Sequence, residues 1–203
     1  MSPRLVIFDM DDVLCRYDLD RRLIALSRVS GKPTRDIRAA IWGSGFEDES
    51  DAGGFPDPSE YLKEFAQRMG HPLTREQWIG ARREAMTPYQ DVLGLAGRIG
   101  ERSRLVIFTN NGPLLKLHLH EVFPEGAAVF AERHCSYEFG AKKPDPNSFL
   151  RLVQKLDVAP QDAWFIDDKI SNVEGARLAG LAGHHFRSHE LLQSEAKALG
   201  LIE

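Results

Sequence analysis

The residues of this chain best suited to chemistry are acidic side chains that directly follow a short apolar run. Asp9 comes after the run at 5–8, and Asp11 lies two positions further on. In an extended chain, residues two apart point the same way, so Asp9 and Asp11 are predicted to face one pocket while Asp12 turns away. Two carboxylates held together repel each other unless a cation or a shared proton offsets their charge. The pair therefore indicates a site that binds a cation or handles protons.

Two further polar clusters follow apolar runs in the same way. Thr109 and Asn110 follow the run at 104–108, and Asp167-Asp168 follows the run at 163–166. A single cluster of this kind is typical of a turn. Three clusters at equivalent ends of apolar runs favour one shared site.

The three apolar runs are predicted to be buried parallel strands, because they are apolar on both faces and rich in β-branched and aromatic residues. Helical patterns lie between them, which indicates an α/β fold: a Rossmann-like parallel sheet with helices on both faces. Weaker strand patterns occur at Val129–Phe130 and Gly183–Phe186. In such sheets, ligands bind beyond the carboxyl ends of the strands, where all three polar clusters fall.

Local signals predict where several helices begin. Ser171 followed by Glu174 has the spacing of a capping box. Pro113 suits the first position of a helix, whose free N–H groups would form an anion site near Thr109. Thr109 is also a candidate N-cap. A further helix is predicted over residues 146–157, with apolar side chains along one face.

The span from Tyr17 to Met86 contains amphipathic helical patterns and no strand pattern. The predicted helices cover residues 19–30, 34–42, 58–69 and 74–86, separated by turns rich in glycine, proline and aspartate. This span is predicted to be a small all-helical cap inserted after the first strand. The predicted division is therefore a core domain of residues 1–16 and 87–203, and a helical cap of residues 17–86.

The order of these motifs resembles that of the haloacid dehalogenase superfamily of hydrolases. Residues 9–13 resemble the first motif, DxDxV, and residues 109–110 resemble the second. Residues 140–146 resemble the third motif, in which the lysine before proline is functional, and this selects Lys143 over Lys142. Residues 165–180 resemble the fourth, and the helical span lies where the type 1 cap of the family inserts. Within the superfamily, the chain is most similar to small phosphatases of the alpha-D-glucose-1-phosphate phosphatase type and to the phosphatase domain attached to some epoxide hydrolases.

This resemblance implies a phosphatase that hydrolyses a small phosphomonoester, a sugar phosphate or similar, through an aspartyl-phosphate intermediate. Asp9 would be the nucleophile. Asp11 would protonate the leaving oxygen and then take a proton from the attacking water. The Thr109 hydroxyl and the Asn110 backbone N–H would hold phosphoryl oxygens, and Lys143 would neutralise charge on the nucleophile and the transferring group.

The resemblance also implies a Mg²⁺ cofactor, a hard ion that prefers carboxylate oxygens. Its expected ligands are the Asp9 carboxylate, the Asp11 backbone carbonyl and Asp168, with Asp167 bound directly or through a water molecule. The chain departs from the family pattern at Asp12, where many members carry glycine. Asp tolerates a left-handed backbone better than most residues, so Asp12 is interpreted as a turn residue.

Several alternatives share parts of this pattern. A 2-haloacid dehalogenase uses the same nucleophile but lacks an acid two residues on, because a halide needs no proton; the presence of Asp11 argues against it. A phosphomutase needs both aspartates and stays open. A phospho-receiver module uses similar residues in the reverse order, and a catalytically silent binding protein on this fold is the remaining non-enzyme alternative.

Composition sets further limits. The net charge of −4 shows no basic excess of the kind that nucleic-acid binders carry. The longest apolar runs are too short to span a membrane, and the N-terminus is not a secretory signal. With two separated cysteines, these features predict a cytoplasmic protein with reduced thiols. The expected partner is a small phosphorylated metabolite, and the expected assembly is a monomer or small homo-oligomer.

Overall fold

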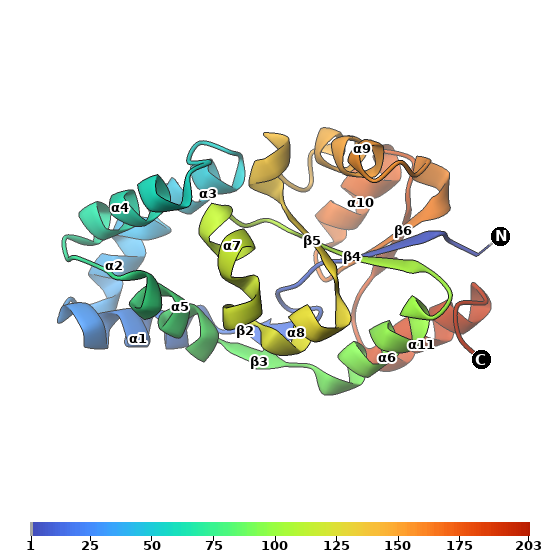
Figure 1. Cartoon of the computed structure of the whole chain (residues 1–203), viewed down its shortest axis with the longest axis horizontal. Coiled ribbons are helices and arrows are strands. Elements are labelled where there is room, and N and C mark those ends of the chain that lie inside the picture. Colours follow the sequence, from blue (N-terminus) through green and yellow to red (C-terminus); the bar gives the residue numbers. More distant parts are fainter. Residues whose placement is uncertain (1) are drawn as a thin grey trace.

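A computed structural model describes residues 2–203 and contains a parallel sheet of five strands in the order β5-β4-β1-β6-β7. The strands are β1 (Leu5–Phe8), β4 (Arg104–Thr109), β5 (Glu132–Cys135), β6 (Ala163–Asp167) and β7 (Ala182–His185). Helices flank this sheet (Figure 1). The predicted α/β fold is thereby confirmed.

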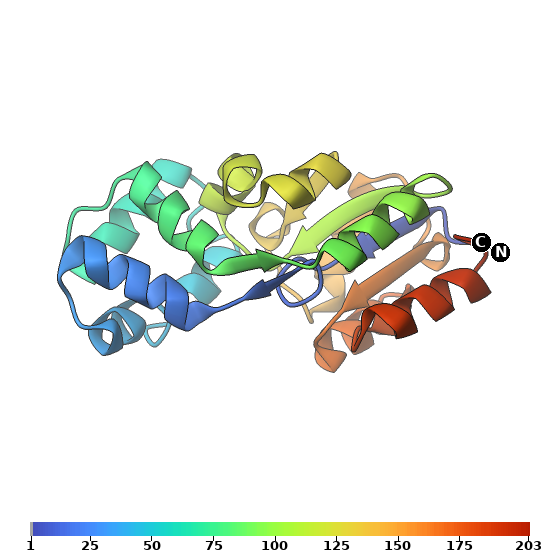
Figure 2. The same cartoon turned by 90° about the horizontal axis from the view of Figure 1, so that it is seen from below.

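Alternate residues of the central strands enter two separate hydrophobic clusters, one on each face of the sheet. In β1, Leu5 and Ile7 pack with α9 (Pro146–Lys155) and α10 (Ile170–Leu178). Val6 and Phe8 belong to the cluster on the other face. On this face of the sheet the cluster includes residues of α6 (Gln90–Gly100), α7 (Pro113–Val122) and α11 (His189–Ala198), and α8 (Pro124–Val129) packs beside α6 and α7. The same cluster continues into the helices between β1 and β4. Figures 1 and 2 show these layers from two directions. This two-sided burial explains why the strands are apolar on both faces.

The segment of residues 15–88, between β1 and β4, is mainly helical and forms the end of the molecule away from both termini (Figures 1 and 2). It begins with β2 (Cys15–Tyr17) and ends with β3 (Met86–Pro88), which pair antiparallel. Its helices are α1 (Leu19–Ser30), α2 (Thr34–Ile41), α3 (Phe46–Asp51), α4 (Pro58–Met69) and α5 (Arg75–Glu84). We call residues 17–86 the helical insertion; its status as a separate domain remains a prediction.

The helical insertion has its own aromatic centre. The Phe46 ring stacks on Tyr61 at 5.2 Å between centroids, and Tyr61 meets Trp78 edge-on at 6.1 Å. These rings come from α3, α4 and α5. Helix α3 was not predicted. The strands β2 and β3 were not predicted either, and they pair at the two ends of this span. These elements are short, so they leave little periodic signal.

Three local predictions were wrong. The strand placed at Val129–Phe130 lies at 132–135, because Val129 ends α8, which starts at Pro124. The predicted capping box at Ser171 does not form. Helix α10 begins at Ile170, its N-cap is Lys169, and no side chain caps it. The helix predicted to reach Met86 ends at Glu84, because Met86 enters β3.

Other local predictions were confirmed. Pro113 occupies the first turn of α7, and both Cys15 and Cys135 are free thiols. Two 3₁₀ helices complete the fold, η1 (Ser136–Phe139) and η2 (Pro160–Asp162). Over residues 2–203, no helix is both long and apolar enough to cross a membrane.

Candidate active site

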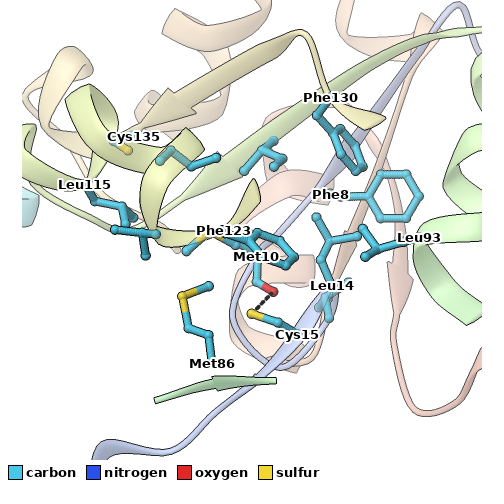
Figure 3. Packing of buried hydrophobic residues seen from close by; sticks show 14 of the residues in the cluster. Phe8, Met10, Leu14, Cys15, Met86, Leu93, Leu115, Phe123, Phe130 and Cys135 are labelled. Carbon is cyan, nitrogen blue, oxygen red and sulfur yellow. Dashed lines mark hydrogen bonds between the residues drawn. The ribbon is translucent and has the colours of Figure 1, made fainter. Parts of the chain in front are cut away.

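Buried side chains anchor the loop after β1 to the hydrophobic core. Met10, Leu14 and Cys15 are fully buried, and Figure 3 shows them among Phe123, Leu93 and Phe130. The Met10 carbonyl accepts hydrogen bonds from the Leu14 N–H at 2.9 Å and from the Cys15 thiol at 3.7 Å. The loop is therefore a tight turn fixed to the hydrophobic core.

Asp12 takes the left-handed backbone that this turn needs, with φ of 62°. Its interpretation as a turn residue agrees with this conformation. Its carboxylate accepts the Tyr17 N–H at 3.1 Å. Asp12 borders the same cavity as Asp11, so the prediction that it turns away from that pocket was wrong. The alternation rule applies to extended chain, and the strand has already ended at Phe8.

Parallel pairing brings two of the predicted acids together. Phe8 lies opposite Ile166, so the next positions, Asp9 and Asp167, are neighbours at the carboxyl edge of the sheet. The Nζ of Lys143 lies 2.8 Å from Asp9 Oδ1 and 2.7 Å from Asp167 Oδ2. All three side chains are at least nine-tenths buried. They form a buried cluster of two carboxylates and one ammonium.

Burial and mutual charge set the ionisation of this cluster. Burial raises the pKa of Asp9 to about 8, against the opposing effect of Lys143. Burial alone would also raise the pKa of Asp167, but Lys143, the Lys169 N–H and Asn172 hold that pKa below its usual value. Burial alone would lower the pKa of Lys143, but Asp9 and Asp167 outweigh it and raise that pKa. The cluster thus fixes Lys143 as a cation and Asp167 as an anion.

The backbone of Lys143 is held by Asn110. The Asn110 side-chain oxygen accepts the Lys143 N–H at 2.9 Å, and its Nδ2 donates to the Lys143 carbonyl at 2.8 Å. Gly175 of α10 allows the same loop to approach, because a Cβ there would lie 2.0 Å from the Pro144 carbonyl oxygen. These contacts place the Lys143 side chain across the ends of β1 and β6.

Asp168 joins Asp9 and Asp167 in a group of three acids, which is the composition of a cation site. One carboxylate oxygen each of Asp9, Asp167 and Asp168 lies within 4.8 Å of the others. Asp168 Oδ1 is buried and has no hydrogen-bond partner among the described residues. Burial and the neighbouring Asp167 raise the pKa of Asp168. Carboxylate oxygens with one unpartnered buried atom fit Mg²⁺, which prefers hard oxygen ligands.

Asp11 lies apart from this group and pairs with the helical insertion. Arg82 Nη2 donates to both Asp11 oxygens, at 3.0 and 2.6 Å. Arg82 belongs to α5, is 2% exposed, and its guanidinium carbon lies 4.0 Å from the centroid of the Tyr17 ring. The Asp11 side chain is 25% exposed, so it meets the space beyond the buried cluster.

Thr109 ends β4, the strand next to β1, and is 2% exposed. Its hydroxyl accepts a hydrogen bond from Asn111 Nδ2 at 2.9 Å. The alternative reading of Thr109 as a helix N-cap was wrong, because Gly112 is the N-cap of α7.

A polar cavity of about 310 Å³ opens beside Asp11. Asn110 and Asn111 border it from the sheet side, and Tyr17, Arg22 and Arg82 border it from the helical insertion. A larger hollow of about 500 Å³ lies between α4 and α7, but apolar side chains such as Leu62 and Leu114 line it, and no acid does. Of these two hollows, only the polar cavity borders residues of the predicted site, such as Asp11 and Asn110.

Sequence reasoning missed Arg82, and for the predicted residue Asn110 it missed the role of the side chain. Arg82 carried a signal, because it lies four positions after Trp78 and three after Ile79, on the buried face of α5. A charged residue on a buried face calls for a partner. The side chain of Asn110 left no such signal, because its partner, the Lys143 backbone, is 33 positions away.

A family comparison assigns the chain. The model of the haloacid dehalogenase-like hydrolases matches residues 3–180. The chain therefore belongs to this family of hydrolases, and the predicted resemblance and the prediction of an enzyme are confirmed.

Among curated proteins, the chain is similar to Phosphatase MT3486 of Mycobacterium tuberculosis, with 27% identity over 91% of this chain and 87% of that protein. It is also similar to the glyceraldehyde 3-phosphate phosphatase of Methanopyrus kandleri, with 25% identity over 81% and 79%. Among solved structures, a HAD family enzyme of Bacteroides thetaiotaomicron in complex with magnesium and inorganic phosphate superposes with a TM-score of 0.75. The identity is 20%, over 92% of this chain and 95% of that one, and this likeness shows the fold.

Proposed function

We propose that the chain is a Mg²⁺-dependent phosphatase that hydrolyses a small phosphomonoester through a phosphorylated Asp9. The observation that carries this proposal is the convergence of Asp9, Asp167 and Asp168 at the carboxyl edge of the sheet, with Lys143 on Asp9. The names of the curated relatives support a phosphoric monoester as the substrate.

In the first half of the reaction, an Asp9 carboxylate oxygen attacks phosphorus. A bond forms between phosphorus and Asp9, and the bond to the leaving oxygen breaks. Asp11, at the edge of the cavity, gives its proton to that oxygen. Lys143 stays within hydrogen-bond distance of Asp9 and offsets the negative charge that gathers there. Thr109 and Asn110, at the end of β4, would hold the phosphoryl oxygens.

In the second half, water attacks the phosphorus of the aspartyl phosphate. Asp11 takes the proton from this water, the bond to Asp9 breaks, and inorganic phosphate leaves. Asp9, Asp167 and Asp168, together with the Asp11 carbonyl, would hold Mg²⁺. When bound, the ion supplies positive charge that keeps the nucleophile ionised and draws the phosphoryl oxygens towards Asp9.

The test is turnover of p-nitrophenyl phosphate by the purified chain, with Mg²⁺ and with Mg²⁺ removed by EDTA. We expect activity that depends on Mg²⁺, and an acid-stable radioactive phosphoenzyme after rapid quenching with a ³²P-labelled substrate. Asp9→Asn should keep its circular dichroism spectrum and lose at least about 10⁴-fold in kcat, because its amide is not a nucleophile. Retained turnover in this variant would place the nucleophile elsewhere. Release of chloride from 2-chloropropionate instead of phosphate release would assign the dehalogenase alternative.

A further inference from the structure

The polar cavity beside Asp11 is the space into which a leaving group would extend. In the proposed reaction Asp11 protonates the leaving oxygen, so the rest of the substrate would extend past Asp11 into this cavity. The cavity volume of about 310 Å³ suits a compact molecule. Tyr17, Arg22, Arg82 and Asp51 line it from the helical insertion. Their charges therefore indicate what kind of leaving group the cavity accepts.

Most charged groups around this cavity already have partners. Asp11 pairs with Arg82, and Lys142 pairs with Asp48. Glu47 accepts the Tyr61 hydroxyl at 3.1 Å on both carboxylate oxygens. The two ion pairs neutralise their own charges. Glu47 has a hydrogen bond but no ion pair within residues 2–203, and its negative charge acts on Arg22.

Arg22 is the exception. It is 4% exposed, and its one hydrogen bond to a described residue joins Nη1 to the Tyr17 hydroxyl at 3.2 Å. Its Nε and Nη2 are buried without partners, and it has no ion pair within residues 2–203. The rings of Trp42 and Trp78 lie 5.2 and 5.0 Å from its guanidinium carbon. Such rings attract a cation but do not satisfy its N–H groups.

A buried guanidinium with two free donors is costly unless an anion joins it. Nε and Nη2 share one edge of the planar group, so their N–H bonds are parallel. This edge matches two oxygens of a single carboxylate or phosphate group. Tyr17 joins this arginine to the catalytic end of the cavity, because its ring also stacks on Arg82.

Asp51, like Glu47, is an acid at this cavity that would argue for a cationic ligand instead. Its side chain makes no hydrogen bond to the described residues, and burial raises its pKa to about 8. At neutral pH it is therefore mostly uncharged and can donate a hydrogen bond to an oxygen atom. Arg22 is then the cation at the buried wall of the cavity whose N–H donors are not all satisfied.

We propose that the leaving group of the substrate carries a second oxyanion, a carboxylate or a second phosphate, which Arg22 binds through its free edge. This inference rests on the proposed phosphatase function and names the class of its substrate. It makes Arg22 a residue that determines specificity, and it assigns the chemical step to other residues.

The test compares matched pairs of substrates. The carboxylate arm compares 3-phosphoglycerate with glycerol 3-phosphate, and the phosphate arm compares 1,3-propanediol bisphosphate with the monophosphate. In at least one arm, kcat/KM should favour the substrate with the second anion by roughly tenfold to a hundredfold, as expected of charge-assisted hydrogen bonds. The arm that shows the preference identifies the oxyanion.

The variants are Arg22→Met, Arg22→Lys and, as a control on the same helix, Arg21→Met, whose side chain is exposed. Arg22→Met should remove the preference mainly through KM, and Arg22→Lys should restore part of it. Arg21→Met should leave the preference unchanged. If Arg22→Met does not fold, Arg22→Lys is used instead, because lysine keeps the positive charge but lacks the two parallel N–H donors of the guanidinium edge.

Binding to Asp9→Asn gives a readout without turnover. Titration with 3-phosphoglycerate or the bisphosphate should change the tryptophan fluorescence, since Trp42 and Trp78 flank Arg22. Turnover of all four substrates with no preference in either arm would overturn this inference and leave the phosphatase function intact. Absence of any turnover, including that of p-nitrophenyl phosphate, would overturn the function itself. Equal losses on all substrates in Arg22→Met would assign Arg22 a purely structural role.

Discussion

At the inner end of the site, Asp9 and Asp167 share Lys143 between adjacent strand ends, whereas at the outer end Asp11 depends on Arg82 from the helical insertion. The inner groups are fixed by strand register and by backbone contacts from Asn110. The outer groups are fixed by packing between two parts of the chain that are 71 positions apart. In the proposed function, the inner end would carry out a reaction common to every substrate, and the outer end would select among substrates.

Lys143→Met should break the inner end for all substrates alike and should lower both activity and stability. It leaves Asp9 and Asp167 as buried neighbours without their cation. We expect a loss of roughly 10²–10³-fold in kcat and a fall of about 3–5 kcal/mol in the free energy of unfolding. Steady-state kinetics at saturating Mg²⁺ measure the loss in kcat, and urea denaturation measures the change in the free energy of unfolding.

Lys142→Met is the matched control for that variant. Lys142 pairs with Asp48 at a partly exposed position, so its loss should cost about 1 kcal/mol or less. If the two variants were equally active and equally stable, the buried cluster would have no special role.

Asp11→Asn should act at the outer end and depend on the leaving group. General acid catalysis typically contributes about 10²–10⁴-fold, and a poor leaving group needs it most. We expect a loss in this range for an alkyl phosphate such as glycerol 3-phosphate, and a clearly smaller loss for p-nitrophenyl phosphate. Equal losses on both substrates would contradict the assignment of Asp11 as the acid.

Asp51→Asn should change the pH dependence of stability. Burial raises the folded-state pKa of Asp51 to about 8, far above its unfolded value. Between the two values the native state holds a proton that the unfolded state has lost, so the free energy of unfolding falls as pH rises through this window. The asparagine variant lacks this titration. Its melting temperature should exceed that of the wild type by a few degrees more at pH 8.5 than at pH 5.

Thermal unfolding of both proteins across this pH range, in the presence of EDTA, measures the difference. A melting-temperature gap that did not change with pH would show that Asp51 is ionised in the folded protein. The cavity would then present an acid as well as a buried arginine, and its preference for an anion would weaken.

The smallest predicted effect concerns His185, which links β7 to the inner end. Its Nε2 lies 2.9 Å from the Asp168 carbonyl oxygen, where it can donate a hydrogen bond. Outer partners of metal ligands typically contribute about tenfold or more to metal affinity. His185→Ala should therefore weaken Mn²⁺ binding, measured by electron paramagnetic resonance, by about that factor. His185→Gln, which can place an N–H at a similar position, should lose less, and an equal loss in both variants would exclude the hydrogen bond as the cause.

The sheet and its clusters could be predicted because they depend on local patterns. Apolar runs on both faces indicate buried parallel strands, and each run ends in the residues that meet at the carboxyl edge. The failures were also local. The predicted capping box at Ser171 is absent because the helix already starts at Ile170. The strand predicted near Val129 is absent there because a helix begins at Pro124 and includes Val129.

By itself, the sequence determined the strand ends, the order of the motifs and the acids at the edge of the sheet, since hydrophobic periodicity and turn chemistry act over a few residues. Only the tertiary structure decided the partners of those acids. Lys143 reaches Asp167 from 24 positions away, and Arg82 reaches Asp11 from 71. The unpartnered edge of Arg22 also became visible only in three dimensions. Ion pairs between distant residues depend on their separation in space, and local sequence patterns do not encode that separation.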